Sequence, residues 1–465
     1  MANTATSMKF GGSHDYLRIL GTDMKKHIGT TQSNYLWISN NPWTIEAWVY
    51  HSGNFVDKTN IYEENTWFQW GDVYLAGVAA YKSTTTARPC FRYYSGSSVD
   101  VVAPDSAENY IYKDSWHHLG VVNEPNVGIK IYLDGKLVQH TATSANIHSG
   151  LADGTSYFMI GGHHNSAYAD WEGYIDEFRF SKTARYGNID VPSGFLSSTQ
   201  TAGRGQNTLL PSHTRLLIQA NSTTTTSDSI IDSTGKHTIT VSGATYSQGV
   251  DSQVGANTVI IMDGTNDTIE IGEGSTDLSP GSNDFSCEGW FYPDAWPANS
   301  TYNFLFGKFH DSSGKKEWML RGQNDGDLLF RYSADGSAET DVEFAGQQRL
   351  TANQWNHVAV GRVGSALCLW INGQLRGFTS ITATIHENTG RFTIGYYKSG
   401  TDTHFYDGYI DCIRYCIGQS AYTPHFTPYG GQKNVVHNRG GAVTDARLAS
   451  ANTHAIQMGR AAIGS

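Results

Sequence analysis

The second half of the chain repeats a series of short motifs from the first half, in the same order. The paired motifs are Trp116-His117-His118 with Trp355-Asn356-His357, Asp134-Gly135 with Asn372-Gly373, and Gly173-Tyr174-Ile175-Asp176 with Gly408-Tyr409-Ile410-Asp411. A repeat with so long a period indicates two copies of a whole domain rather than a solenoid of small units. Shared positions are therefore candidates for scaffold, and positions that differ between the copies are better candidates for individual function.

The composition of both copies favours β-structure. Short runs rich in Val, Ile, Tyr, Phe and Trp are separated by Gly, Asn, Asp and Ser, and Gly alone contributes 50 of the 465 residues. The segments 43–50 and 285–292 alternate apolar and other residues, as a strand with one face in a core does. At equivalent places, Asp134-Gly135 and Asn372-Gly373 follow apolar runs. These dipeptides predict type I′ hairpin turns, in which both central residues have positive φ.

Charge and cysteine content exclude several classes of function. A formal net charge of −11 without clustered Lys and Arg argues against nucleic-acid binding. No apolar stretch is long enough to span a membrane, and the first residues lack the basic start and apolar core of a secretory signal. The five cysteines are odd in number, and four of them fall in the second copy. We therefore expect free thiols in a protein made in a reducing cytosol.

The repeat and the composition divide the chain into four parts. We predict a first domain over 1–200, a linker over 201–212, a second domain over 213–428 and a docking tail over 429–465, which has no aromatic residue after Tyr429. The polar stretch from about Pro192 to Ser212 is typical of a flexible connection. A strand expected at 215–221 has no counterpart in the first copy, which leaves a sheet edge open. We hypothesise that the linker, the tail or a neighbouring subunit fills it.

The shared motifs resemble those of a known family. They are the segments 44–49 (Thr-Ile-Glu-Ala-Trp-Val), 116–119, 131–135 and 173–180, joined in the second copy by 214–221 and 422–424. They are similar to the concanavalin A-like, laminin G-like jelly-roll domains, in the form found in structural proteins of tailed bacteriophages. The resemblance implies an all-β fold of two tandem jelly-roll β-sandwiches with a short linker and an extended C-terminal tail.

The shared acidic residues are predicted to be structural. The resemblance to glucanases implies two Glu flanking an Asp on one strand, and a retaining glycosidase needs two carboxyl groups about 5 Å apart. No such run occurs, since Glu46 and Glu288 each stand alone on their strand, beside Trp48 or Trp290. We expect each to be a buried or rim carboxylate that is hydrogen-bonded for the architecture. The pairs Asp176 and Asp411, and His118 and His357, are also expected to be structural, so the chain is predicted not to be an enzyme.

The loops that follow Gly161 and Gly395 differ between the copies and are the candidate binding loops. Lectin sites pair an exposed aromatic platform with polar groups, and the candidates of this composition are Tyr168, Asp170, Trp171, Tyr396, Tyr397 and Tyr406. The alternative is that these aromatic residues pack on the rim or in subunit contacts. The similar pentraxins place calcium ligands after the equivalent strand, which implies the candidate ligands Asn165, Asp170, Asp311 and Asp402. Because His163, His164 and Lys398 are poor calcium ligands, the expectation is no cofactor, with calcium as the alternative.

Together, the resemblance and the missing signal favour a non-enzymatic virion protein, either a head decoration or a tail or fibre component, assembled in the host cytoplasm. Its predicted partners are other virion proteins, through 429–465 and the open edge of the first domain, and further copies of itself. A carbohydrate-binding adhesin that attaches to cell-surface glycans is the alternative function. A glycan hydrolase or lyase is less favoured because the carboxylate pair is missing.

Overall fold

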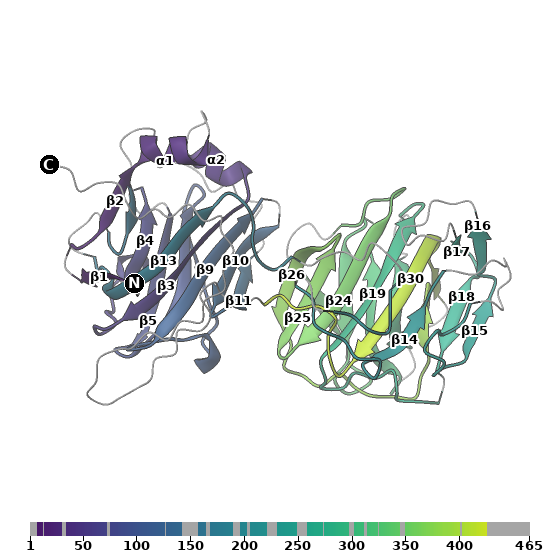
Figure 1. Cartoon of the computed structure of the whole chain (residues 1–465). Coiled ribbons are helices and arrows are strands. Elements are labelled where there is room, and N and C mark those ends of the chain that lie inside the picture. Colours follow the sequence, from purple (N-terminus) through teal and green to yellow (C-terminus); the bar gives the residue numbers. More distant parts are fainter. Residues whose placement is uncertain are drawn as a thin grey trace, which may run out of the picture.

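The structure consists of two β-sandwiches side by side in one chain (Figure 1). The computed structural model describes residues 7–12, 14–29, 34–71, 75–125, 127–141, 157–163, 168–188, 196–201, 205–220, 230–248, 258–272, 274–296, 302–310, 314–323, 325–344, 349–399 and 402–425. Each sandwich pairs two antiparallel sheets, which confirms the predicted pair of jelly-roll domains. Among the described residues, no helix has the length and apolar character needed to cross a membrane.

The first domain packs a six-stranded sheet against a seven-stranded one. The six-stranded sheet runs β1 (Met8–Gly11), β13 (Glu172–Ser181), β3 (Trp43–His51), β9 (Trp116–Glu124), β10 (Gly128–Leu133) and β11 (Lys136–Thr141). The seven-stranded sheet runs β2 (Leu17–Leu20), β12 (Tyr157–Ile160), β4 (Thr66–Trp70), β5 (Leu75–Ser83), β6 (Thr86–Tyr94) and β7 (Ser98–Val102), with β8 (Ile111–Tyr112) on β6. Two helices, α1 (Gly21–Ile28) and α2 (Asn34–Asn40), and two single turns, η1 (Ile61–Glu63) and η2 (Ala107–Asn109), complete it.

The second domain repeats this plan with additional strands. Its eight-stranded sheet runs β16 (Thr245–Gln248), β17 (Thr258–Asp263), β30 (Asp407–Ile417), β19 (Phe285–Pro293), β24 (Asn356–Val363), β25 (Ala366–Ile371) and β26 (Gln374–Ser380), with β14 (Thr214–Ile218) on β30. The other sheet runs β15 (Ile239–Ser242), β18 (Thr268–Ile271), β27 (Phe392–Ile394), β20 (Asn303–Phe309), β21 (Lys316–Gly322), β22 (Leu328–Tyr332) and β23 (Thr340–Glu343). A small hairpin joins β28 (Tyr396–Ser399) and β29 (Asp402–Phe405).

Alternation along the central strands places one face of each sheet in a core. In β3, Trp43, Ile45, Ala47 and Val49 enter the core of the first domain, and Phe285, Cys287 and Phe291 of β19 enter that of the second. Trp48 and Trp290 point the other way, and each packs edge-on against a histidine, His118 or His357. Both histidines are buried, which agrees with the structural role expected of them.

The backbone repeats as closely as the sequence does. Asp134 has φ 51° and Gly135 φ 80°, and the equivalent turn at Asn372 and Gly373 has φ 50° and 76°. Positive φ at both central residues confirms the predicted hairpin turns. A bulge in the last strand is shared as well, because Glu177 in β13 and Cys412 in β30 have φ of 50° and 54° at equivalent positions.

The segment predicted to be a flexible linker packs on the second domain where it is described. Leu196 is buried with Leu217 and Trp290, and the side-chain amide of Gln200 donates to the carbonyl of Ala421 at 2.9 Å. Flexibility was therefore the wrong prediction for 196–201 and 205–212, because these residues have apolar and backbone partners. The same residues do not fill the open edge of the first domain. The tail over 429–465 lies outside the described residues, so its docking, and the filling of that edge by it or by a subunit, stay predictions.

The two domains meet through equivalent hairpins, β10–β11 and β25–β26, in a nearly symmetric contact. The backbone N–H of Leu137 donates to Nδ1 of His425 at 3.1 Å, and the equivalent N–H of Leu375 donates to Oδ1 of Asn188 at 3.2 Å. Tyr132 and Trp370, which are also equivalent, are fully buried in one shared cluster. Each domain thus receives the segment that follows the last strand of the other.

All five cysteines are described, buried and unpaired, which confirms the prediction of free thiols.

Candidate functional site

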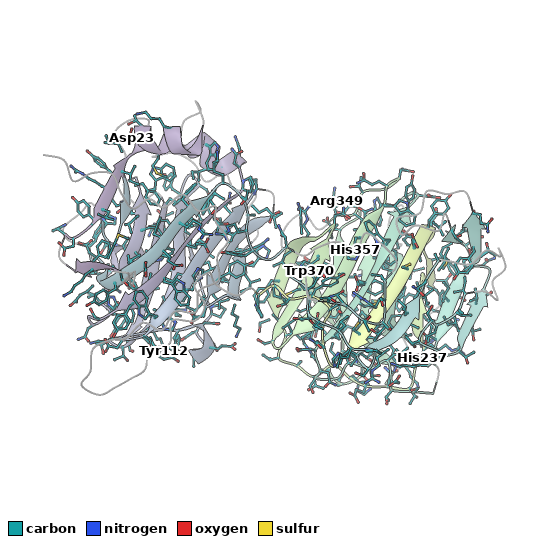
Figure 2. All side chains as sticks on the ribbon, in the orientation of Figure 1. Asp23, Tyr112, His237, Arg349, His357 and Trp370 are labelled. Atoms are coloured by element: carbon teal, nitrogen blue, oxygen red, sulfur yellow. The ribbon has the colours of Figure 1, made fainter. Side chains whose placement is uncertain are left out.

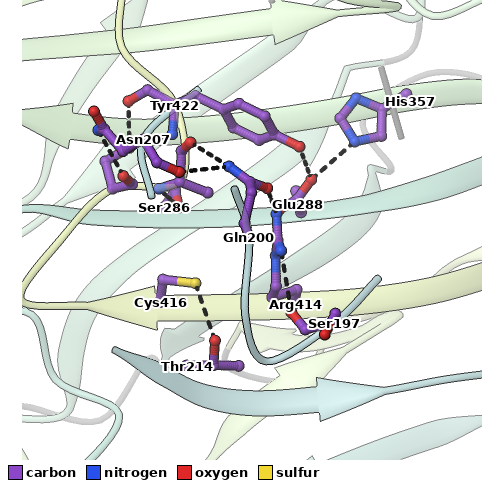
Figure 3. Close-up of polar contacts among 12 residues, drawn as sticks. Ser197, Gln200, Asn207, Thr214, Ser286, Glu288, His357, Arg414, Cys416 and Tyr422 are labelled. Atoms are coloured by element: carbon purple, nitrogen blue, oxygen red, sulfur yellow. Dashed lines mark hydrogen bonds and ion pairs between the residues drawn. The ribbon is translucent and has the colours of Figure 1, made fainter. Parts of the chain in front are cut away.

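A buried carboxylate lies on the face of the eight-stranded sheet that points away from the core of the second domain (Figure 3). Glu288 on β19 is 1% exposed, and its Oε1 accepts the Nε–H of Arg414 on β30 at 2.7 Å. Its Oε2 lies 3.1 Å from Nε2 of His357 on β24 and accepts the hydroxyl of Tyr422. The guanidinium of Arg414 is itself held by the carbonyl of Ser197 at 3.1 Å. Three strands, β19, β24 and β30, and the segment that follows β30 therefore all contribute to one buried ionic cluster.

The partners of Glu288 keep it ionised. Burial by itself would raise the pKa of Glu288, but the Arg414 guanidinium and the hydrogen bonds from His357 and Tyr422 lower that pKa to about 2. A carboxylate in this state has no proton to donate near neutral pH, and its oxygens are occupied and hidden from solvent. The cluster fits the predicted architectural role of Glu288.

The first domain contains the same cluster in a more open form. Glu46 pairs with His118 at 3.3 Å and accepts hydrogen bonds from Arg185 and the hydroxyl of Tyr186. Arg179, the equivalent of Arg414, is 3.6 Å from the Glu46 carboxylate. The pKa of Glu46 is lowered as well, because these contacts outweigh its burial. Glu46 is thus buried and hydrogen-bonded, as predicted.

The aromatic residues predicted to form a sugar platform are mostly inside the protein. Trp171 and Tyr406 have no exposed surface, and Tyr397 is only 5% exposed. Trp171 packs in the first core and donates its indole N–H to the carbonyl of Tyr50. These three rings cannot present a face to a sugar, so the expected platform is corrected to packing in buried clusters. Tyr168 and Tyr396 are partly exposed, and they lie in different domains.

Of the four predicted metal ligands, only the side chain of Asp170 lies within the described part of the chain. Asp170 is 4% exposed, and its carboxylate accepts the backbone N–H groups of His14 at 2.8 Å and of His163 at 2.6 Å. Asn165, Asp311 and the side chain of Asp402 lie outside what the structure describes. Within the described residues, no three His, Cys, Asp or Glu side chains are grouped as a metal site requires. Calcium binding stays a prediction.

A polar cleft at the outer end of the second domain was not predicted. It encloses about 500 Å³ between the loop before β15, the strand β18 and the loop after it. Its lining includes Lys236, His237, Glu270, Asp277 and Arg391, and His237 marks its place in Figure 2. Arg391 pairs with Glu270, and Nε2 of His237 lies 3.3 Å from the Asp277 carboxylate. Side chains that donate and side chains that accept hydrogen bonds therefore line one hollow.

The sequence did contain a signal for this cleft. Lys236 and His237 belong to the stretch before β17 that has no counterpart in the first copy, and unshared stretches were the better candidates for function.

Comparison with known proteins identifies the family. The profile described as "Concanavalin A-like lectin/glucanases superfamily" matches residues 23–187 and 263–416, which together make up more than half of the chain. The chain belongs to the concanavalin A-like superfamily. The two matched regions correspond to the two sandwiches. No curated protein matches the sequence.

Several solved structures are similar to part of this concanavalin A-like chain. Domain 4 of AbnA, an extracellular arabinanase from Geobacillus stearothermophilus solved with arabinotriose, has 18% identity and a TM-score of 0.34 over 46% of this chain and 95% of its own. The binding domain of Paraclostridial Mosquitocidal Protein 1 has 16% identity and a TM-score of 0.35 over 46% of this chain and 50% of its own. A botulinum neurotoxin type C structure has 13% identity and a TM-score of 0.33 over 44% of this chain and 48% of its own. The chain therefore spans about half the length of these two toxin structures.

Proposed function

We propose that this concanavalin A-like protein is a non-enzymatic structural component of a tailed-bacteriophage virion, a head decoration or a tail or fibre component. The proposal that the protein is non-enzymatic rests on the burial of Glu46 and Glu288. Each carboxylate is ionised, hydrogen-bonded and buried, so it supports the sheet instead of reaching a substrate. The resemblance of the motifs to phage structural domains supports the virion part.

The close contact between the domains also supports a structural role. Trp370, Leu375 and Leu137 are buried between the hairpins, and backbone N–H groups of both domains are bonded across the contact. A pair of domains held in this way can present binding surfaces at a fixed separation.

Removing the segment beyond Tyr429 should abolish incorporation of the chain into particles, because the tail is the proposed attachment to other virion proteins. Incorporation is measured by quantifying the chain in purified particles from a host that supplies only the truncated form. The control is the full-length chain supplied in the same way, and circular dichroism establishes that the truncated protein is folded. Undiminished incorporation of the truncated chain would contradict the tail's role.

A second candidate function, attachment to cell-surface glycans, is favoured by the polar cleft. Sugars offer hydroxyl groups that both donate and accept hydrogen bonds, and the cleft provides Arg391 and Lys236 as donors beside Glu270 and Asp277 as acceptors. Its volume of about 500 Å³ is within the range of small-molecule sites.

Arg391→Ala should weaken glycan binding on the order of tenfold, because a hydrogen bond to a charged group contributes roughly 1.5–3 kcal/mol. Binding is screened on an array of bacterial and algal glycans, and the affinity for any positive glycan is then measured by calorimetry. Arg349→Ala is the matched control, since Arg349 is an exposed arginine of the same domain that pairs with Asp325 away from the cleft. Absence of binding by the wild-type chain across the array would leave assembly as the main role.

A further inference from the structure

We propose that copies of this chain associate head to tail, with the free edge of the first domain added to the free edge of the second domain of the next copy. This deepens the assembly role proposed above by naming one partner, a second copy of the chain. The two edges lie at opposite ends of the molecule, β1 and β2 at one end and β15 and β16 at the other (Figure 1).

The duplication shows what the edge of the first domain lacks. Ile160 and Ile394 are equivalent, and they pair with Leu17 on β2 and Ile269 on β18. Ile269 is completely buried, whereas Leu17 is 48% exposed. Ile269 is covered because the strand β15 lies beside β18, with Val241 paired to Ile269 and Ile239 paired to Ile271. Among the described residues, no strand pairs with the corresponding edge of β2.

The exposed apolar side chains gather at these two ends. The described residues include seven large apolar side chains classed as exposed, and four of them are Met8, Leu17 and Leu20 at one end and Ile231 at the other. Exposed apolar groups that are collected in this way, rather than scattered, mark interaction sites.

The far end of the second domain offers a complementary surface. A second hollow, of about 230 Å³, lies along β15 and is lined by the apolar residues Ile230, Ile231, Ile239 and Val241 together with Asp232, His237 and Thr238. It is several times larger than the roughly 30 Å³ that one water occupies in the liquid, so it can receive a side chain such as Leu17 of the next copy. Exposed apolar side chains at one end and a hollow at the other form a heterologous contact. Such a contact can be repeated from each copy to the next.

Sheet geometry and charge agree with this pairing. β15 is a free edge of its sheet within the described chain, and an antiparallel strand added to it keeps the alternation of apolar and polar faces. The exposed Arg18 on the polar face of β2 would then lie beside Thr240, close to the cleft that contains Glu270 and Asp277. At the same two ends, β1 and β16 are the edge strands of the opposite sheets among the described residues, so both layers of the sandwich can continue.

The association is expected to be weak and to depend on concentration, because short edge strands bury less than the roughly 1,200–2,000 Å² of a standard interface. Sedimentation of the full chain should show an average mass that rises with concentration beyond that of a dimer. A wild-type chain that sediments as a single copy at every concentration would overturn the proposal.

Variants at each end make the test specific for head-to-tail pairing. A Leu17→Lys, Leu20→Lys double variant blocks the first end and Ile231→Lys blocks the second, so each alone should remain a monomer. An equimolar mixture of the two retains one working end of each kind and should form dimers and nothing larger. Leu210→Lys is the matched control, because Leu210 is 56% exposed and lies on the segment before β14 rather than at either edge. It should associate like the wild type.

Persistent dimers of Ile231→Lys would show instead that two β2 edges pair with each other, and this would refute the head-to-tail arrangement. Circular dichroism confirms that each variant is folded. Particle incorporation of these variants reports on the virion role separately, so failure of one proposal is distinguishable from failure of the other.

Discussion

Replacing Arg414 by Met should cost the second domain on the order of 3–5 kcal/mol in free energy of unfolding. The substitution keeps the length and packing of the side chain but leaves the Glu288 carboxylate, 1% exposed, without a cation that is always charged. The change in free energy of unfolding is measured by urea unfolding monitored by tryptophan fluorescence, and separately by calorimetry.

The equivalent substitution in the first domain, Arg179→Met, is the matched control. Its effect should be much smaller, because Arg185 remains beside Glu46 and both arginines are more than a quarter exposed, where water screens the lost charge. Ala421 occupies the place of Arg185 in the second domain, so Arg414 has no substitute there. Equal destabilisation by the two substitutions would contradict this account of the cluster.

Trp370→Ala should both destabilise the protein and loosen the contact between its domains. Removing a buried Trp costs roughly 3–5 kcal/mol, and here it also removes the hydrogen bond from Nε1 to the carbonyl of Gly187 at 3.1 Å. Trp370 lies on the side of the second domain that faces the first (Figure 2). We expect the two domains to unfold in separate transitions, and X-ray scattering in solution to show a larger radius of gyration.

Trp296→Ala provides the comparison for the interface. Trp296 is partly buried at the rim of the second core, outside the cluster that Trp370 shares with the first domain. Its loss should lower stability without changing the radius of gyration. An unchanged radius for Trp370→Ala would mean that the hairpins do not hold the domains together.

The sequence predicted the parts of the structure that follow from local pattern and from repetition. Asp134-Gly135 and Asn372-Gly373 predicted two hairpin turns because few residues tolerate positive φ. Glu46 and Glu288 were assigned to the scaffold because both copies keep a lone carboxylate beside a tryptophan. These inferences needed only spacing and residue type.

The features that the sequence did not predict depend on contacts between segments that are distant in the chain. Trp171 and Tyr406 lie in polar stretches typical of exposed loops, yet each ring is fully buried in the core of its domain. The buried pair of Lys308 and Glu317 was missed because the equivalent of Lys308 in the first copy is Trp70, an ordinary core residue. Only the three-dimensional structure shows which charge finds a partner.

The contact between the domains did leave one trace in the sequence. In β25, Leu367, Leu369 and Ile371 face the core, so Cys368 and Trp370 must point outward. Apolar residues on both faces of a strand indicate that both faces are covered. Copy-by-copy comparison could therefore have located the interface, although not its partner residues.

Each domain contacts the segment that follows the last strand of the other domain, and this limits how the chain can be divided. Asn188 accepts a hydrogen bond from the β25–β26 hairpin of the second domain, and His425 accepts one from the β10–β11 hairpin of the first. The segment after the last strand of each domain therefore packs on the other domain. Neither half is a portable module. A single copy made alone would expose Tyr132 or Trp370 to water, and engineering that transplants one sandwich must bring the other hairpin with it.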